Sequence, residues 1–389
     1  MTKKTKKYLQ EAKPSSIDFN TVTEAIYILF MFRSSLLLML ILSCFHYSCT
    51  PSVSGAAGTE VGTDTLKPEP VELLRNEAEH KVDVLVGGNL FTSYLYLEKL
   101  KKPVLYPIYS SEGNLVTRGF PLANRAGERT DHPHHVGLWL NYGDVNGLDF
   151  WNNSEAIEED KKGRYGSIVH RDIVVIKGGQ GEGELVVTAD WIDSQGKVLL
   201  NEKTQYLFRG EGAMRSIDRI THLTAVHRVD LKDNKEGMLG IRVSRELEHP
   251  SDQPEKYTDS LGQTIDVPWV NKKGVSGLYY GSNGIRGESV WGTRAEWMAL
   301  NGMIDGESVT IVIFDHPENI GFPTYWHARG YGLFAANPLG QKALSNGRDE
   351  LNFSLQAGET VVFKHKIVIY SGEVKEDQLH QQFRAFSVQ

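Results

Sequence analysis

The chain has 389 residues and carries 42 lysine and arginine residues against 49 aspartate and glutamate residues, a net charge of −7. This acidic balance argues against a nucleic-acid partner and against a polybasic membrane-binding surface. Both cysteines, Cys44 and Cys49, lie near the N-terminus, which excludes disulfides, thiolate nucleophiles and cysteine-ligated metals from all later residues.

The first 49 residues resemble an export signal preceded by an extension. Arg33 precedes an apolar run at 34–45, SSLLLMLILSCF, which is the arrangement of a bacterial secretory signal. We expect Met31 to be the true start and 1–30 to be an upstream extension. The alternative is a start at Met1 with the run as an uncleaved anchor. No later segment approaches the roughly 20 apolar residues that a membrane-spanning helix needs.

The two cysteines at the end of this run predict lipidation. Ile41 lies three residues before Cys44 and Ser43 directly before it, as in lipoprotein signals, whereas Cys49 leads directly into a polar spacer. The sequence therefore predicts an exported protein, periplasmic or anchored to the outer membrane through a lipid on Cys49 or Cys44. The alternative is two incidental cysteines in a signal peptide.

The rest of the chain predicts one β domain behind a tether. Residues 50–75 are expected to be a flexible tether, because Ser, Thr, Gly, Pro and Ala dominate its first part. Residues 76–389 are expected to form a single all-β domain, a large antiparallel β-sandwich, with one short C-terminal helix in 373–386. Alternating apolar and polar residues predict strands at 82–87, 91–98, 103–109, 136–141, 168–176, 185–191, 198–209, 213–226, 238–245, 308–314, 331–336 and 361–369.

The segment 131–151, DHPHHVGLWLNYGDVNGLDFW, gathers residue types that form functional sites. Pro133 favours extended backbone at His132, which puts His132 and His134 on one face of a strand. These two imidazoles would either form an open zinc or iron site with a distant third ligand, or supply a general acid whose neighbour, such as His135, fixes its tautomer. Hydrogen-bonded histidines at a strand end are the remaining interpretation.

The aspartates and tryptophans of the same segment are further candidates, and most of them have two interpretations. Asp144 begins a predicted turn, and Asp149 is either a carboxylate partner for the histidines or a turn cap. Trp139 and Trp151 would either stack on a sugar ring or belong to the core.

A second group of site-forming residues lies at 315–340. His327 and Arg329 lie two residues apart there, and Asn337 follows. A guanidinium can hold a carboxylate or hydroxyl groups in a fork, so this group suits a polyhydroxylated ligand. The alternative is that Arg329 pairs structurally with Asp315 or Glu318.

An epimerase or mutarotase needs a carboxylate opposite a histidine, since one group removes a proton while the other donates one. Glu296, between Trp291 and Trp297, is a candidate for this carboxylate, and Arg118 is a weaker candidate for ligand binding. The sequence has no phosphate-binding loop, no zinc-protease helix motif and no serine-hydrolase elbow.

Together with WHARGYGLFAANPLG at 326–340, the 131–151 segment resembles a bacterial family labelled methane oxygenase PmoA, whose members are commonly exported proteins of Bacteroidota and Planctomycetes. The resemblance covers roughly residues 80–372. Many members carry a basic residue where this chain has Val136. The positions that match its motif are His132, His134, His135, Asp144, Asp149, Trp151, His327 and Arg329.

The family label implies a metal-dependent oxygenase. Particulate methane monooxygenase, however, is built from several membrane-spanning helices, whereas this chain has one apolar segment. In strand pattern and in its aromatic, histidine and arginine residues, the family is similar to carbohydrate-processing sandwiches of the galactose mutarotase type.

Three functions follow as hypotheses. The leading one is an enzyme that acts on a sugar or glycoside by epimerisation, hydrolysis or elimination. The alternatives are a glycan-binding lipoprotein without catalysis and an oxygenase that uses a divalent metal, for which His132 and His134 would be ligands. No cofactor is required by the first two. The catalytic candidates are His134, His135, Asp149, His327 and Glu296, and the substrate-binding candidates are His132, Trp139, Asp144, Trp151, Arg329 and Asn337.

Overall fold

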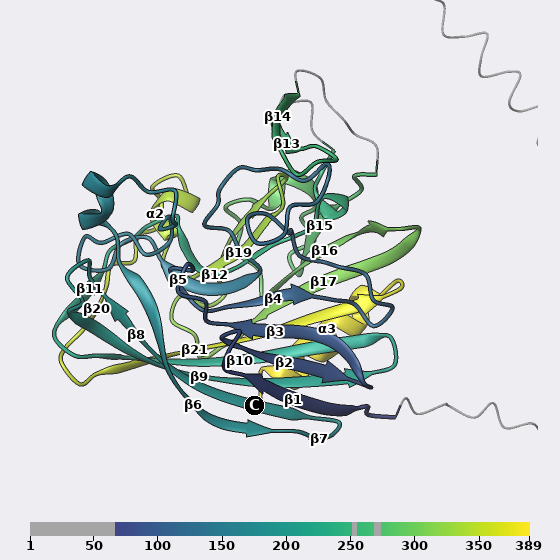
Figure 1. Ribbon diagram of the computed structural model, residues 1–389, viewed down its shortest axis with the longest axis horizontal. Coiled ribbons are helices and arrows are strands. Elements are labelled where there is room, and N and C mark those ends of the chain that lie inside the picture. The colour runs from purple at the N-terminus through teal and green to yellow at the C-terminus, as the bar shows by residue number, and fades with distance from the viewer. Residues whose placement is uncertain (1–66, 251–254, 268–273) are drawn as a thin grey trace, which may run out of the picture. The chain divides into compact units, whose positions relative to one another are not determined.

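A computed structural model describes residues 67–250, 255–267 and 274–389, and two large antiparallel sheets dominate these residues (Figure 1). In the described chain the first sheet has nine strands, in the order β18 (Tyr325–Arg329), β19 (Leu333–Asn337), β12 (Gly237–Arg242), β5 (Leu138–Tyr142), β4 (Val104–Ile108), β3 (Asn89–Leu95), β2 (Lys81–Val86), β1 (Pro70–Asn76) and β7 (Gly179–Gln180).

The second sheet has eight strands within the same residues. Their order is β15 (Leu278–Gly281), β16 (Trp297–Ile304), β17 (Glu307–Asp315), β21 (Thr360–Ser371), β10 (Met214–Ala225), β9 (Val198–Glu211), β8 (Gly183–Ile192) and β6 (Ser167–Lys177). Short strands form two further pairs, β11 (Val229–Leu231) with β20 (Phe353–Leu355) and β13 (Glu255–Thr258) with β14 (Thr264–Val267).

The main core lies between the two large sheets. Alternation along each strand divides the side chains between this core and the outer face. In β2, for example, Val82, Val84 and Val86 are buried in the core. In β17, Val309, Ile311 and Ile313 enter the core, while Val312 and Phe314 belong to a second apolar cluster on the outer face.

One helix covers that second cluster. Helix α3 (Glu376–Phe386) buries Leu379, Phe383 and Phe386 against the eight-stranded sheet. The helix prediction at the C-terminus is therefore confirmed. The remaining helical segments are short: η1 (Glu159–Arg164), η2 (Arg245–Leu247), η3 (Gly287–Val290) and α2 (Gln341–Leu344).

Loops rather than a helix cover the outer face of the nine-stranded sheet. A third apolar cluster lies there, with Trp139, Trp151, Val104 and Leu333 among its buried members. The loops over it come from residues near 100, 121–136 and 151–156, which also line a cleft. This face carries the candidate site.

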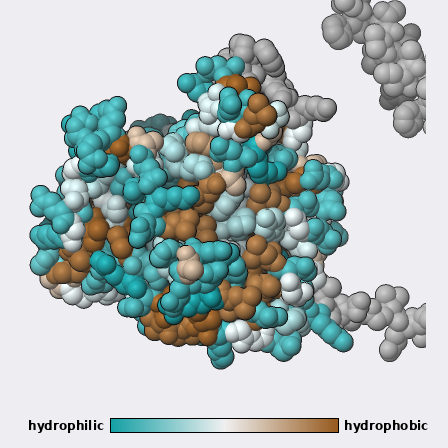
Figure 2. Space-filling model, viewed as in Figure 1, coloured by the Kyte–Doolittle hydropathy of each residue, from teal (hydrophilic) through white to brown (hydrophobic). Residues whose placement is uncertain are grey.

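Figure 2 shows that hydrophilic side chains cover much of the viewed surface, with the clearest apolar area along its lower edge over β1 and β6. Leu74 on β1 and Val174 on β6 are exposed apolar residues. No helix among the described residues is long and apolar enough to span a membrane.

The predicted fold class, a large antiparallel β-sandwich, is confirmed. One boundary was wrong. Residues 70–75, expected to end the tether, form most of β1 and pair with β2, because Val71 is buried in the core despite its polar neighbours. The β13–β14 hairpin lies in the long connection between η2 and β15. The predicted export signal, its cysteines and residues 50–66 lie outside the described residues.

Candidate active site

Four neighbouring strands bring the two predicted clusters onto one sheet. Pairing aligns Trp139 of β5 with Gly240 of β12, Gly240 with Ala335 of β19, and Ala335 with His327 of β18. Directly paired residues point to the same face of a sheet, so these four residues form one row on the outer face. The segments 131–151 and 315–340 thus share this face.

A stack of four aromatic rings connects the segments. The ring of Tyr331 lies parallel to that of His132 at 5.1 Å between centroids, and His132 lies parallel to His135 at 4.8 Å. Trp139 continues the stack 5.3 Å from His135. The ring of His134 meets His135 edge-on at 4.3 Å. The turn between β18 and β19 therefore contacts the histidine segment directly.

Asp131 is the carboxylate partner of His132. Its Oδ1 accepts hydrogen bonds from Arg118 Nη1 at 2.8 Å and Arg242 Nη2 at 2.6 Å. Its Oδ2 lies 2.8 Å from Nδ1 of His132. Burial raises the pKa of Asp131, but the hydrogen bond with His132 and the charges of Arg242 and Arg118 outweigh it and hold this pKa well below its usual value. Asp131 is therefore ionised at neutral pH.

This pairing leaves a basic nitrogen open on His132. An ionised carboxylate only accepts hydrogen bonds, so Nδ1 of His132 carries a proton, and in the neutral tautomer the lone pair is on Nε2. The side chain of His132 is 40% exposed, and its backbone has a φ of +44°, which a non-glycine residue rarely adopts. The strained backbone thus presents an oriented imidazole to solvent.

Arg118 fixes the loop that carries this pair. Besides Asp131, its guanidinium donates to the carbonyl oxygens of Asp131, His132 and His135 at 2.8, 2.9 and 3.0 Å. The side chain is 1% exposed. Because one rigid fork binds several carbonyls, the loop geometry depends on a residue outside the loop.

His134 and His135 are neutral rather than proton carriers at neutral pH. Burial, and then the charge of Lys102, lowers the pKa of His134 to about 2. Burial, and then the neighbouring His134 and Arg242, lower the pKa of His135 far below its usual value. Arg242 Nη1 lies 3.2 Å from Nδ1 of His135 and can only donate, so His135 carries its proton on Nε2.

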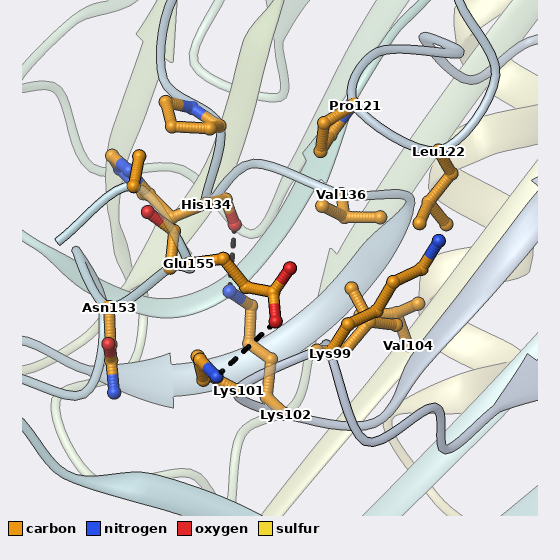
Figure 3. A pocket seen from close by; sticks show the side chains of 14 residues that line it. Lys99, Lys101, Lys102, Val104, Pro121, Leu122, His134, Val136, Asn153 and Glu155 are labelled. Atoms are coloured by element: carbon orange, nitrogen blue, oxygen red, sulfur yellow. Dashed lines mark hydrogen bonds and ion pairs between the residues drawn. The ribbon is translucent and has the colours of Figure 1, made fainter.

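A cleft of about 280 Å³ opens beside His134 (Figure 3). Toward one end lie the polar residues Lys101, Lys102, Asn153 and Glu155 with His134, and toward the other end lie apolar residues, Val104, Pro121, Leu122 and Val136. The ring of His132 lies 5.6 Å from that of His134. The Asp131–His132 pair is therefore a neighbour of this cleft.

Lys102 is a functional candidate that the sequence analysis missed. Its side chain is almost fully buried, and Nζ donates to the carbonyl oxygen of His134 at 2.7 Å. Burial lowers the pKa of Lys102 to about 7, and the charge of Asp149 offsets this only partly. An amine with this pKa can exchange a proton at neutral pH. No local motif marks it, since the burial comes from distant loops.

The buried amine predicts a pH-dependent stability. Above pH 7 the folded protein releases the proton of Lys102, whereas an unfolded lysine keeps it up to its usual pKa of 10.5. Stability relative to Lys102→Met should therefore rise from pH 7 towards 10, by up to roughly tenfold in the folding equilibrium constant per pH unit. Urea unfolding of both proteins across this range measures the difference. A constant difference would contradict the buried ammonium, and the exposed Lys203→Met should parallel wild type.

Asp149 and Asp144 hold turns. Oδ1 and Oδ2 of Asp149 accept hydrogen bonds from the backbone and side-chain nitrogens of Asn152 at 2.9 and 2.8 Å. Oδ1 of Asp144 accepts from the backbone of Gly147 at 2.9 Å. Neither carboxylate is bonded to a histidine. The expected partnership of Asp149 with His134 or His135 is therefore corrected: the carboxylate that bonds to a histidine in this segment is Asp131, and its partner is His132.

Three other predicted ligand contacts are closed off. Trp139 and Trp151 are fully buried, with their rings 5.2 Å apart, so neither offers a face on which a sugar could stack. Asn337 is also fully buried and donates to the carbonyl oxygen of Asn234 at 2.9 Å. These residues support the site from beneath, as the core interpretation of the tryptophans expected.

Gly240 leaves the space that this tryptophan pair needs. A Cβ at position 240 would lie 2.8 Å from Trp139 and 3.0 Å from Trp151. We expect Gly240→Ala to destabilise the fold by about 1–3 kcal/mol, because the closely packed rings must shift. Urea unfolding monitored by tryptophan fluorescence measures this. Gly163→Ala, where the added methyl group meets open space, is the control. Equal stability of both variants would contradict tight packing.

His327, Arg329 and Glu296 lie outside the ring stack. His327 Nδ1 lies 2.9 Å from the carbonyl oxygen of Lys235, and burial lowers the pKa of His327 to about 4, although Glu236 opposes this. The exposed Arg329 lies over Trp291 and over Tyr331 at 5.7 and 5.9 Å.

The expected structural partners of Arg329 are engaged elsewhere. Asp315, the last residue of β17, accepts hydrogen bonds from Asn319 and Thr324, and Glu318 pairs with Lys364 of β21. Glu296 directly precedes β16 of that sheet, and its backbone bonds with Ser282 and Asp315. Of these three candidates, only Arg329 thus contacts the stack, through Tyr331.

The metal hypothesis requires a third ligand beside His132 and His134. Among the described residues, no three His, Cys, Asp or Glu side chains are grouped so that they could hold an ion. Nδ1 of His132 is already committed to Asp131. The third ligand that the metal hypothesis requires is therefore not found among the described residues.

Comparison with protein families gives one match. A model described as "Family of unknown function (DUF6807)" matches residues 81–384. The chain belongs to this family. The site described above lies entirely within the matched residues. No curated protein matches the chain in sequence.

Several solved structures are similar to this member of the family at low identity. An α-galactosidase from Geobacillus stearothermophilus has 12% identity and a TM-score of 0.37, covering 81% of this chain and 42% of its own length. One from Lactobacillus brevis has 11% identity, a TM-score of 0.37, and coverage of 81% and 41%. Galactose 1-epimerase from Lactobacillus acidophilus has 9% identity, a TM-score of 0.34, and coverage of 79% and 100%. The chain spans about two fifths of the α-galactosidases.

Proposed function

We propose that this protein is an enzyme that acts on a sugar or glycoside by proton transfer, with His132 as the base and Asp131 as the residue that positions it. One observation carries the proposal. Asp131 is held by two arginines through one oxygen and orients His132 through the other, at 2.8 Å. A carboxylate that fixes the tautomer of an exposed imidazole is the arrangement of a general base.

The cleft beside the pair supports a polyhydroxylated ligand. Asn153, Ser154 and Glu155 supply amide, hydroxyl and carboxylate groups, while Pro121 and Leu122 supply apolar surface. Sugars need both, because their hydroxyl groups form hydrogen bonds and their C–H faces pack on apolar side chains. Lys102 and His134 provide further groups on the same wall. In this proposal Lys102 is the second proton carrier.

The proposed chemistry is proton transfer to and from the bound sugar. His132 removes a proton from a carbon or oxygen of the bound sugar, and a protonated Lys102 returns one at the other end. Such a pair serves epimerisation, hydrolysis or elimination alike, so the reaction class is decided by assay.

The test is a panel of free sugars, glycosides and keto-glycosides incubated with purified protein comprising residues 67–389, followed by NMR. We expect turnover of at least one compound and none with Asp131→Asn/His132→Asn. Binding without turnover of any compound would contradict the enzyme and favour the glycan-binding alternative. Turnover that needs added iron or copper would favour the oxygenase that the resemblance implies.

The location of the protein is a separate proposal. We propose that it is exported and lipid-anchored through Cys49 or Cys44, on the strength of the apolar run at 34–45 and the small residues before each cysteine. Mass spectrometry of the protein from membranes, compared with Cys49→Ser and Cys44→Ser, tests this. An unmodified N-terminus in the soluble fraction would contradict it.

A further inference from the structure

The cleft beside His134 is positively charged, although the chain as a whole is acidic. Its lining includes Lys99, Lys101 and Lys102, and the single carboxylate among its lining residues is Glu155. Glu155 is largely exposed and lies 3.9 Å from Lys101. The chain carries a net charge of −7. The excess of cations is therefore a local property of this cleft.

Lys102, the most buried of these cations, has no ion-pair partner among the described residues. Nζ of Lys102 donates to the carbonyl oxygen of His134, and 5.4 Å away it faces the ring of Trp139. Within the part of the chain that the structure describes, Lys102 forms no ion pair with a carboxylate. An ammonium group can donate three hydrogen bonds, and burial without a charged partner is costly. A ligand that enters the cleft would supply this partner.

The charged groups behind the cleft do not provide a counter-ion for Lys102. The buried Arg118 and Arg242 share the one carboxylate of Asp131, whose remaining oxygen faces His132. Because two guanidinium groups face one carboxylate, they leave a net positive charge behind the cleft wall. An anion in the cleft would be attracted by all of these groups.

We propose that the ligand of the cleft is a sugar that carries a negatively charged group, which pairs with Lys102 while Lys99 and Lys101 at the rim attract it. This inference rests on the proposed function and names its substrate class. The shared chemistry is an anionic oxygen group, which a sugar carries as a carboxylate, a phosphate ester or a sulfate ester. Charge-assisted hydrogen bonds of this kind add strength and orientation.

The experiment is isothermal titration calorimetry of the purified protein. The titrants are glucose, glucuronic acid, glucose 6-phosphate and glucose 6-sulfate, together with galactose and galacturonic acid. We expect at least one acidic sugar to bind tenfold to about a hundredfold more tightly than its neutral parent, the gain of one hydrogen bond to a charged group. Lys102→Met should remove this preference, and the exposed Lys203→Met should keep it. Comparison of the carboxylate, phosphate ester and sulfate ester identifies the anionic group.

The other outcomes separate the two proposals. Equal affinity for neutral and acidic sugars, unchanged in Lys102→Met, would overturn the anionic substrate and leave the sugar enzyme standing. Acetate or inorganic phosphate binding as tightly as every acidic sugar would contradict the sugar itself. A preference for acidic sugars that survives in Lys102→Met would overturn the assignment to Lys102. Circular dichroism of each variant confirms that it is folded.

Discussion

Replacement of Asp131 by alanine should destabilise the protein by about 3–5 kcal/mol, because two buried guanidinium groups lose the carboxylate that they share. Arg118 and Arg242 are 1% and 0% exposed, so water cannot replace the lost partner without opening the loop. Asp131→Asn, which keeps one acceptor oxygen, should cost less. The free energy of unfolding in urea measures both effects.

A matched control separates burial from charge. Glu155→Ala removes a carboxylate that is 63% exposed and pairs loosely with Lys101, so it should leave stability almost unchanged. If Asp131→Ala unfolds at the same urea concentration as wild type, Asp131 does not compensate the two arginines. The structural account of the histidine loop would then be wrong.

Replacement of His132 by asparagine should lower kcat by roughly 10²–10⁴-fold on whichever sugar the panel identifies, the usual contribution of a general base. Asparagine tolerates the φ of +44° at this position, so the loop keeps its shape and the thermal midpoint should change little. Initial rates at saturating substrate, with the midpoint measured in parallel, test the prediction.

His227→Asn is the matched control, since this histidine is also exposed but lies outside the site. It should retain wild-type rates. If His132→Asn retains them as well, Asp131 and His132 have a structural role only, and the proton would have to pass through Lys102. A rate loss that is accompanied by unfolding would also contradict the proposal, because the exposed ring should not be needed for stability.

Much of the fold could be predicted from the sequence because long strands repeat a simple pattern. In β9 and β10, every second residue enters the core over most of their length, so the period of two is visible. The strands that were missed lack it. Residues 297–300 of β16 and Tyr325–Ala328 of β18 are buried on both faces, where alternation disappears.

The site was predicted in part, as a segment rather than as a mechanism. His132, His134 and His135 were recognised by residue type, and 315–340 was recognised as a second group of site-forming residues. The distinction among the three rings was not, because it depends on burial: His132 is open, while His134 and His135 are enclosed. Arg242, Tyr331 and Lys102 come from other parts of the chain, and only the fold brings them to the histidines.

Because Arg118 lies outside the histidine loop at 131–135, the geometry of that loop depends on two separate stretches of sequence. A lysine there would donate from one nitrogen and could not reproduce the two-nitrogen fork with which the guanidinium binds the three carbonyls. Anyone who transplants the histidine loop onto another β-sandwich must bring this arginine from its own strand connection as well. Without it, the grafted loop would keep its residues and lose their arrangement.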